Sequence, residues 1–242
     1  MKDPLVFLPG MMCDARLFGP QIAALSPYLP VTVAPISHGD RIEEIASGLL
    51  DHLPRRFALA GLSMGGIVAL EIVRRAPDRV TRLCLMDTNS LAETPQSAAN
   101  YEPIVTKLRA GFIDQAVSTL LRPDHLAPNA DRTSIMHMVT KMAENLGADA
   151  ITRQVRALQR RRDYQATLRK ITVPTLVMCG VHDTLTPVKR HEFMAGLIPY
   201  AELALVQEAG HLPTLETPEA VTAALRVWLK QPLVLQKRVE AG

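Results

Sequence analysis

The chain has 242 residues, of which 48% are hydrophobic and 21% are charged, and its formal net charge is +3. This composition is that of a globular protein and excludes an intrinsically disordered chain. The small charge surplus gives no indication of nucleic-acid binding, and three cysteines are too few for a disulfide scaffold. No apolar run has the length of a signal-peptide core or a membrane span. We therefore expect a soluble, cytoplasmic protein without membrane association, and the length suits one α/β domain.

Short apolar runs alternate with longer amphipathic stretches along the chain. The runs are rich in Val, Leu and Ile and lack period-two alternation, which is typical of strands buried on both faces of a parallel sheet. The predicted strands are Leu5–Leu8, Val31–Ala34, Phe57–Ala60, Leu83–Met86, Thr175–Cys179 and Leu203–Val206. Helical periodicity between them, as in 42–53, predicts an α/β fold with a mostly parallel sheet of about six strands. The last residues, 231–242, are expected to form a loose tail.

The alternation is interrupted between about Leu91 and Lys170, where helical patterns occur without a convincing strand. Roughly eighty residues are far more than a normal connecting loop contains. We predict a core formed by residues 1–90 and 171–242, and a helical cap formed by residues 91–170 and inserted before the penultimate strand. The predicted cap helices are Ala98–Leu108, Gly111–Leu121, Asp131–Leu146 and Ala148–Arg161. We interpret this insertion as a lid over a site; the alternative is a helical subdomain that only extends the core.

The segment Gly61-Leu62-Ser63-Met64-Gly65-Gly66 follows the third predicted strand and precedes a helical pattern that begins at Ile67. It matches Gly-x-Ser-x-Gly in a strand–turn–helix context, the nucleophile elbow. In such an elbow a strained turn lifts the serine hydroxyl out of the backbone, and the glycines on either side avoid steric crowding. A phosphate-binding turn is the alternative, but neither Gly-x-Gly-x-x-Gly nor a P-loop lysine is present. Ser63 is therefore the predicted nucleophile.

A serine nucleophile needs a base, and the base needs an acid that orients it. For this architecture the expected chain order is Ser, then Asp or Glu, then His. Asp183 follows the fifth predicted strand and His211 follows the sixth, so both lie at the carboxyl ends of strands, where open α/β sheets place their sites. We predict a catalytic triad of Ser63, Asp183 and His211. Asp87, which ends the fourth strand, is the alternative acid, or else a turn or cap residue.

An acyl-transfer site also needs two hydrogen-bond donors for the oxyanion of its intermediate. The backbone N–H of Met64 is one predicted donor, because it follows the nucleophile. The other is the N–H of Met11 in the loop after the first strand, where Gly10 would allow a close approach. Met12 is the second choice as donor and a candidate substrate contact. Cys13 in the same loop is expected to be a small buried residue rather than a nucleophile.

The remaining histidines carry weaker predictions. His38 follows the second strand and is a candidate substrate contact. His52 and His191 lie on helical patterns, where a solvated surface is expected, and His125 and His137 fall in the insertion. Neither His-Glu-x-x-His, nor Cys-x-x-Cys, nor a dinucleotide fingerprint occurs, so we predict no cofactor and no metal.

The whole-chain charge conceals a basic segment in the insertion. Residues 148–170 include seven basic and two acidic side chains, and therefore carry a net charge of +5. Within it, Arg153, Arg156 and Arg160 share one helix face. We favour a solvated face with local ion pairs; the alternative is that Arg156 and Arg160 contact an anionic acyl substrate or an acidic carrier protein. Phe112 is a candidate apolar substrate contact, or a core residue.

These motifs resemble the α/β-hydrolase superfamily over nearly the whole chain. The resemblance rests on Gly61–Gly66, on Asp183 after its strand and on the Gly-His pair of Gly210–Pro213. The segments Pro174–Val177 and Gly210–Pro213, with Glu216, are similar to the carboxylesterase-like branch, which includes pimeloyl-ACP methyl ester esterases, lactonases and C–C bond hydrolases. The branch usually has His-Gly before the oxyanion donor, where this chain has Leu-Pro-Gly.

The resemblance implies a serine hydrolase that cleaves a small or medium carboxylic ester through an acyl-enzyme. Ser63 would attack the carbonyl, His211 would take its proton, and Asp183 would fix the imidazole tautomer. Hydrolysis of a lactone, an amide or a C–C bond at the same triad remains open, as does a ligand-binding relative with little turnover. Many members begin with an additional hairpin, for which no room precedes Leu5, so we expect six strands rather than eight.

Overall fold

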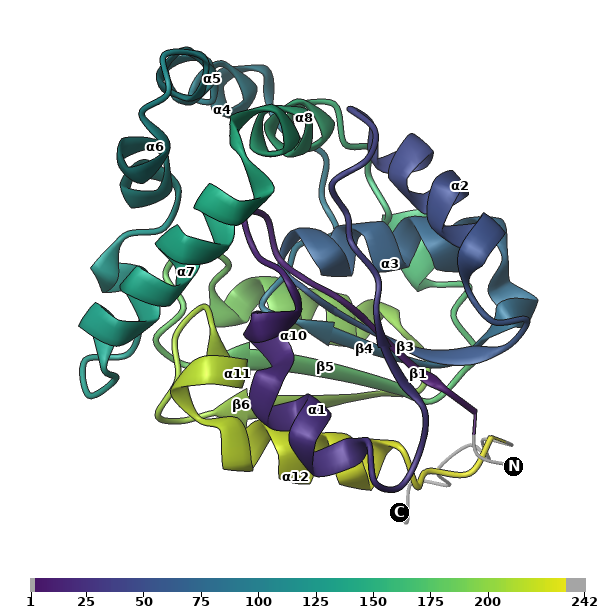
Figure 1. Ribbon diagram of the computed structural model, residues 1–242. Helices are drawn as coiled ribbons and strands as arrows, with labels where there is room; N and C mark the ends of the chain where they lie inside the picture. Colours follow the sequence, from purple (N-terminus) through teal and green to yellow (C-terminus); the bar gives the residue numbers. More distant parts are fainter. Residues whose placement is uncertain (1–2, 234–242) are drawn as a thin grey trace.

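A six-stranded sheet forms the centre of the computed structural model, which describes residues 3–233 (Figure 1). The strand order is β2-β1-β3-β4-β5-β6, and every neighbouring pair is parallel. The strands are β1 (Leu5–Leu8), β2 (Val31–Val33), β3 (Phe57–Leu62), β4 (Val80–Met86), β5 (Thr175–Gly180) and β6 (Ala201–Val206). The predicted parallel six-stranded sheet is confirmed. The expected tail lies, from residue 234 on, outside the described residues.

Burial differs between the central and the edge strands. Every residue of β1, β3 and β5 is buried, whereas β2 and β6 have exposed and half-buried positions. Leu203 and Leu205 of β6 are 38% and 39% exposed. The prediction that all six strands are buried on both faces is therefore wrong for the two edge strands. An edge strand has only one neighbouring strand and lies at the margin of the helix layers.

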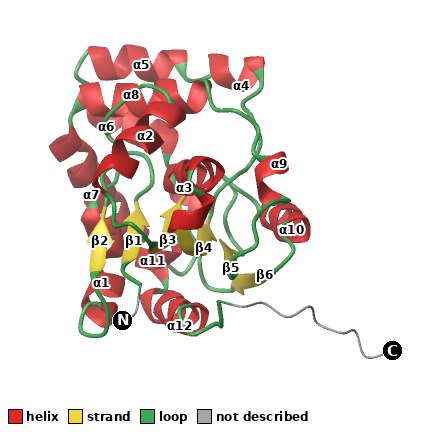
Figure 2. Ribbon diagram, turned by 90° about the vertical axis from the view of Figure 1, so that its right-hand side faces the viewer, coloured by secondary structure: helices red, strands yellow, loops and turns green. Residues whose placement is uncertain are grey.

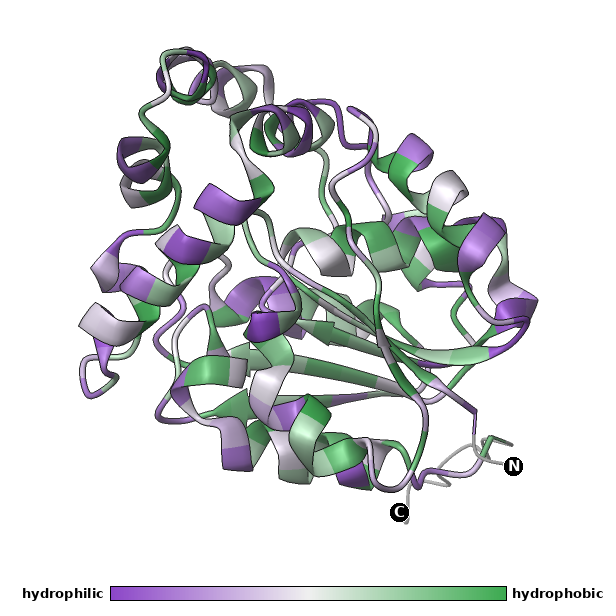
Figure 3. Cartoon of the chain, in the orientation of Figure 1, coloured by the Kyte–Doolittle hydropathy of each residue, from purple (hydrophilic) through white to green (hydrophobic). Residues whose placement is uncertain are grey.

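Helices cover both faces of the sheet, as Figure 2 shows. Alternate residues of β1 enter two separate cores: Leu5 and Phe7 enter one, and Val6 and Leu8 enter the other. The first core contains residues of α1 (Gly19–Leu25) and α12 (Pro218–Trp228); the second contains residues of α2 (Ile42–His52), α3 (Met64–Arg75) and α10 (Val188–Leu197). Hydrophobic residues concentrate on the strands and on the inward sides of these helices (Figure 3). Each fully buried large apolar side chain contributes about 1.5–3 kcal/mol.

A block of helices connects β4 to β5. It comprises α4 (Pro95–Ala99), α5 (Glu102–Arg109), α6 (Ile113–Leu120), α7 (Arg132–Leu146), α8 (Ala148–Gln159) and α9 (Gln165–Leu168). The strand arrows point toward most of this block, so its helices lie beyond the carboxyl edge of the sheet (Figure 2). The predicted helix Ala98–Leu108 is interrupted, because Pro103 has no N–H and its ring would clash with the carbonyl four residues earlier. Within residues 3–233, no helix is both long and apolar enough to span a bilayer.

Candidate active site

Ser63 lies in a sharp turn between β3 and α3. β3 ends at Leu62, α3 begins at Met64, and Ser63 between them has φ 54° and ψ −118°. A positive φ is strained for a residue with a side chain. Two bonds hold this turn: the N–H of Ser63 donates to the Met86 carbonyl (2.9 Å), and the Thr88 hydroxyl donates to the Ser63 carbonyl (2.6 Å). The backbone thus has the strained strand–turn–helix geometry that the motif predicts.

The two glycines of the motif are required by close backbone contacts. A Cβ on Gly61 would lie 2.4 Å from the carbonyl oxygen of Gly65, and a Cβ on Gly65 would lie 2.1 Å from that of Leu8. Both distances are too short for any side chain, so α3 can start against β1 and β3 only with glycine here. Gly10 differs from expectation, since a Cβ there would lie 3.5 Å from Ser63 Cβ, an ordinary contact.

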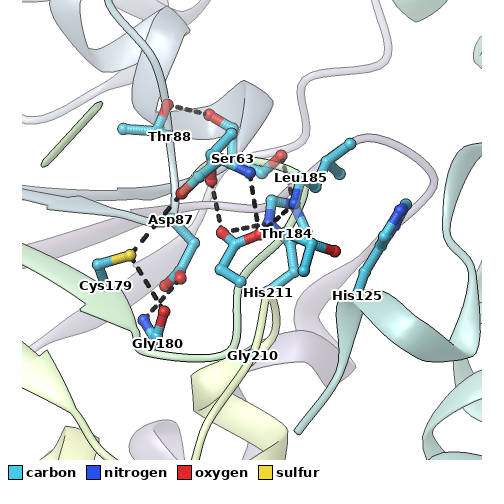
Figure 4. A network of polar contacts seen from close by, with 12 residues as sticks. Ser63, Asp87, Thr88, His125, Cys179, Gly180, Thr184, Leu185, Gly210 and His211 are labelled. Atoms are coloured by element: carbon cyan, nitrogen blue, oxygen red, sulfur yellow. Dashed lines mark hydrogen bonds and ion pairs between the residues drawn. The ribbon is translucent and has the colours of Figure 1, made fainter. Parts of the chain in front are cut away.

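Three loops at the carboxyl edge of the sheet bring Ser63, Asp183 and His211 together. His211 Nε2 lies 3.0 Å from Ser63 Oγ, and His211 Nδ1 lies 2.8 Å from Asp183 Oδ2. Figure 4 shows Ser63 and His211 facing each other. Asp183 and His211 are each only 3% exposed. When Nδ1–H donates to the carboxylate, Nε2 is left as an acceptor for the serine proton, which is the arrangement a general base requires.

The carboxyl of Asp183 is held in its ionised form. Burial opposes ionisation, but the His211 ring and the bonds from Thr186 outweigh it, so that the pKa of Asp183 is lowered below its usual range. Oδ1 accepts the backbone N–H groups of Leu185 (2.8 Å) and Thr186 (2.9 Å), and Oδ2 accepts the Thr186 hydroxyl (2.5 Å). These donors fix the carboxylate in the orientation that meets the imidazole.

The two predicted oxyanion donors border the same space. Met11 and Met64 both line the cavity that contains Ser63, and neither backbone N–H donates to another described residue. The N–H of Met12, the second choice, is occupied, since it donates to Oε1 of Gln154 at 3.0 Å. Met12 itself has φ 66° in this turn. Burial raises the pKa of Cys13 to about 12, which keeps its thiol protonated at neutral pH, as expected for a buried structural cysteine.

Two cavities meet at Ser63. The larger has a volume of about 740 Å³ and extends between the β4–α4 segment, helices of the insertion and the β5–α10 loop. The smaller has a volume of about 40 Å³ and is lined mainly by apolar side chains. Ser63 and Met11 line both cavities, whereas His211 lines the small one and is not among the residues of the large one. Ser63 therefore lies between a small apolar cavity and a large cavity of mixed polarity.

The structure does not bring the two predicted arginine contacts to either cavity. Arg156 pairs with Glu102, and Arg160 pairs with Asp40 at 2.6 Å. Both belong to or directly follow α8, and neither lines the large or the small cavity. The local ion pairs of the favoured interpretation are present, but only Arg160 of this face is exposed; Arg156 and Arg153 are half-buried, and Arg153 Nε donates to the Ser37 carbonyl at 3.2 Å. Other cations line the large cavity, namely Arg122, Arg161 and Arg190.

Of the other candidate substrate contacts, Met12 lines a cavity at Ser63, whereas His38 and Phe112 do not. Met12 lines the small cavity, as a substrate contact would. His38 is exposed and borders neither cavity at Ser63, because the loop that carries it is bonded to α8, where the Ser37 carbonyl accepts the Nε–H of Arg153 at 3.2 Å. Phe112 is 50% exposed, since it immediately precedes α6 on the outside of the insertion, and it likewise lies outside both cavities.

Sequence reasoning missed two side chains that hold the site loops in place. The Glu216 carboxylate accepts the N–H groups of Gly210 (2.9 Å), Leu212 (2.8 Å) and Ala127 (2.7 Å), so it fixes the backbone on both sides of His211. Gln154, buried in α8, holds the loop that carries Met11 through the N–H of the next residue. Glu216 was part of the family resemblance, but only the tertiary structure reveals its partners; Gln154 left no signal beyond its place in the insertion.

Two histidines also lie closer to the site than their sequence positions indicate. His191 is fully buried rather than solvated, and its Nε2 accepts the N–H of Thr88 at 2.9 Å. Burial lowers the pKa of His191 to about 4, so the ring is neutral. His125 lines the large cavity, and its carbonyl accepts the N–H of His211 at 2.8 Å. Figure 4 shows the His125 ring beside His211 and Thr184.

The chain is similar to known proteins over most of its length. A family model described as "Alpha/beta hydrolase family" matches residues 5–224. The chain is 32% identical over 224 residues to the "Pimeloyl-[acyl-carrier protein] methyl ester esterase" of Aromatoleum aromaticum, covering 83% of this chain and 90% of that protein.

Two solved structures share the fold. The first is a thermophilic esterase from Thermogutta terrifontis, with a TM-score of 0.85, 26% identity and coverage of 93% of this chain and 89% of that one. The second, an enol-lactonase from Burkholderia xenovorans, has a TM-score of 0.81, 24% identity and coverage of 96% and 92%. The match of the family model to most of the chain, together with the similarity to named hydrolases, leads to one conclusion. This chain belongs to the alpha/beta hydrolase family of enzymes.

Proposed function

We propose that this protein is a serine hydrolase of carboxylic esters, with Ser63 as nucleophile, His211 as general base and Asp183 as the acid that orients the base. The observation that carries the proposal is the continuous contact from Ser63 Oγ to His211 Nε2 (3.0 Å) and from His211 Nδ1 to Asp183 Oδ2 (2.8 Å). This chain of contacts starts at a strained elbow whose positive φ exposes the hydroxyl to two cavities. A buried structural serine would require neither the strain nor the aligned imidazole.

In the proposed reaction Ser63 Oγ attacks the ester carbonyl while His211 Nε2 takes the hydroxyl proton. The N–H groups of Met11 and Met64 receive the oxyanion, a contribution of about 3–4 kcal/mol for one such donor. His211 then returns the proton to the departing alcohol, which leaves an acyl group on Ser63. Water, activated by the same imidazole, hydrolyses the acyl-enzyme and restores the serine.

The two cavities support a small alcohol and a large acyl group. His211 must reach the departing oxygen, and it lines the small cavity. A cavity of about 40 Å³ has room for only a small alcohol, so it suits a methyl ester. The acyl group would then extend into the large cavity of about 740 Å³. The name of the similar protein from Aromatoleum aromaticum, a methyl ester esterase, agrees with this assignment.

The lining of the large cavity supports an acyl group that carries polar atoms. The cavity holds a Glu93–Arg161 ion pair, whose side chains are only 8% and 10% exposed, beside the phenol of Tyr101. Arg190 and Arg122, the latter paired with Asp124 at 3.0 Å, also line this cavity and are exposed. We propose these two arginines, in place of Arg156 and Arg160, as contacts for an acidic carrier protein that delivers the acyl chain. Helices α4–α9, around residues 91–170, would then act as the cap over the site.

A substrate panel tests the proposal. Wild type and Ser63→Ala would be compared on methyl and butyl esters of short and long acids, free and attached to a carrier protein. Ser47→Ala, an exposed serine in α2, is the matched control. We expect hydrolysis in wild type and Ser47→Ala, its loss in Ser63→Ala, and a preference for the methyl over the butyl ester of one acid. Absence of Ser63-dependent release on every ester, or turnover of lactones alone, would refute the ester assignment.

A further inference from the structure

Asp87 lies directly behind the predicted triad and has no part in the proposed reaction. It follows the last residue of β4, and its φ of 42° is strained for a residue with a side chain. Its N–H donates to the carbonyl of Met178 in β5 at 3.0 Å, and its Oδ1 accepts the N–H of Gly180 at 2.9 Å. Asp87 therefore connects the end of β4 to the segment that leads to Asp183. It does not contact His211, as the alternative acid of the triad would.

The carboxyl of Asp87 is buried without a compensating cation. The side chain is 0% exposed, and Oδ2 has no hydrogen-bond partner among the described residues. An unpaired buried carboxylate costs several kcal/mol, which a protonated carboxyl avoids. Figure 4 shows the Asp87 side chain directed at Gly180, beside Cys179.

The titratable groups around Asp87 are acids. One donor atom each from Asp87, Cys179 and Asp183 lies within 4.8 Å of the others, and Glu216 and Cys84 are the further acidic neighbours. The nearby bases are otherwise engaged: the His211 ring bonds to Asp183, and the His191 ring accepts the Thr88 N–H. Burial, followed by the negative charge of Asp183, raises the pKa of Asp87 well above its usual value. Because four donors hold Asp183 ionised, the proton of the pair resides on Asp87.

Building on the proposed function, we propose that Asp87 is a positioning residue: a neutral carboxylic acid that presents its O–H to the ionised Asp183 and holds Gly180 through its other oxygen. The O–H dipole stabilises the negative charge of Asp183, whereas a second carboxylate at this place would repel it. Asp87 acts on the reaction only through the orientation and charge of Asp183.

Asparagine has the same neutral charge and the same kinds of hydrogen-bonding groups as a protonated Asp87, whereas alanine has neither group. In Asp87→Asn the amide oxygen still accepts the Gly180 N–H and the amide nitrogen donates as the O–H did. We expect Asp87→Asn to keep kcat within about threefold of wild type, with the acid limb of the kcat/KM–pH profile unmoved. Asp87→Ala should lose about tenfold or more in kcat with KM nearly unchanged, because Asp183 loses its support but the cavities do not change.

If Asp87 were instead an ionised carboxylate, Asp87→Asn would remove a negative charge near His211, and the acid limb of the kcat/KM–pH profile would move to lower pH. That result would overturn the proposal, as would activity in Asp87→Ala equal to that in Asp87→Asn, or loss of activity on treatment with a chelator.

Stability provides a readout that needs no substrate. Folded wild type keeps a proton on Asp87 that the unfolded chain releases above about pH 4, so wild type loses stability relative to Asp87→Asn as the pH rises. Between pH 5 and 7 we expect the folding equilibrium constant of Asp87→Asn to gain about tenfold per pH unit over wild type, measured by urea unfolding. Asp51→Asn, at an exposed aspartate of α2, is the control and should run parallel to wild type. Parallel curves for Asp87→Asn would refute the neutral acid. Activity that survives in Ser63→Ala would instead refute the proposed function and leave this stability test standing.

Discussion

Replacing Glu216 with glutamine perturbs the loop that carries His211 without touching the predicted triad. The Glu216 carboxylate accepts three backbone N–H groups: Oε2 accepts those of Ala127 and Gly210, and Oε1 accepts that of Leu212. Glutamine has one acceptor oxygen and one amide nitrogen that only donates. In its better orientation the oxygen keeps the two bonds at the Oε2 position. The nitrogen then faces the N–H of Leu212, which is left without an acceptor.

The loss of stability can be worked out from these three hydrogen bonds. Hydrogen bonds to a charged group contribute about 1.5–3 kcal/mol each, and the remaining two bonds weaken when the charge is lost. We therefore expect Glu216→Gln to lower the free energy of unfolding by about 2–4 kcal/mol, a large part of the 5–15 kcal/mol of a typical domain. The Leu212 N–H adjoins His211, so the imidazole should shift as well. A displacement of about 1 Å costs up to 10²-fold in turnover.

Urea unfolding at pH 7 and kcat/KM on the best ester of the panel would measure both effects. Glu219→Gln, the same chemical change at an exposed position of α12, is the control and should stay within about 0.5 kcal/mol of wild type. The reasoning fails if Glu216→Gln matches Glu219→Gln in both measurements. A loss of stability with unchanged kcat/KM would show that the Glu216 bonds stabilise the fold but do not position His211.

Three further outcomes are expected. Asp183→Asn should lower kcat by about 10⁴-fold, far more than Asp87→Asn, because the amide would favour the wrong imidazole tautomer; the reverse order in steady-state kinetics would assign the acid to β4. Gly65→Ala should abolish activity and disrupt folding, because its Cβ would lie 2.1 Å from a backbone carbonyl oxygen, whereas Gly48→Ala in α2, with nothing within 4 Å of its Cβ, should raise the melting temperature; equal effects would contradict the packing argument. His191 is protonated in the unfolded chain below about pH 6.5 but in the folded protein only below about pH 4, so the free energy of unfolding should fall by about 3 kcal/mol as the pH is lowered through this interval. In His191→Gln this dependence of the free energy of unfolding on pH should disappear from the urea unfolding curves. If the variant keeps the pH dependence of wild type, the His191 ring is protonated within the folded protein.

The order of strands and helices could be predicted because each element has its own local hydrophobic pattern, which does not depend on the other elements. Each buried strand shows its own apolar run, and each helix shows its own period, so six strands and the helical insertion could be predicted without knowledge of their contacts. The edge strands β2 and β6 departed from the expected burial, since their apolar runs resemble those of the central strands. The interruption of the first insertion helix before Pro103 could have been predicted from that proline.

In the candidate site, too, some residues could be predicted from the sequence and others could not. Ser63, Asp183 and His211 were proposed from one motif and from strand ends, because parallel strands deliver their carboxyl ends to one edge. The cation contacts were not predictable, since an arginine on a helix face has the same sequence pattern whether it meets a ligand or an acidic neighbour such as Glu102 or Asp40.

The sequence by itself determined the family, the parallel sheet and the identity of three chemically suited side chains, because apolar periodicity and the Gly-x-Ser-x-Gly spacing are local constraints on the backbone. Tertiary structure alone decided which polar groups are partners. It placed Glu216 across three N–H groups, Gln154 on the loop of Met11, and Asp87 in a buried cluster behind Asp183. Long-range hydrogen bonding and burial set the charge and orientation of a side chain, and both depend on segments that are far apart along the chain.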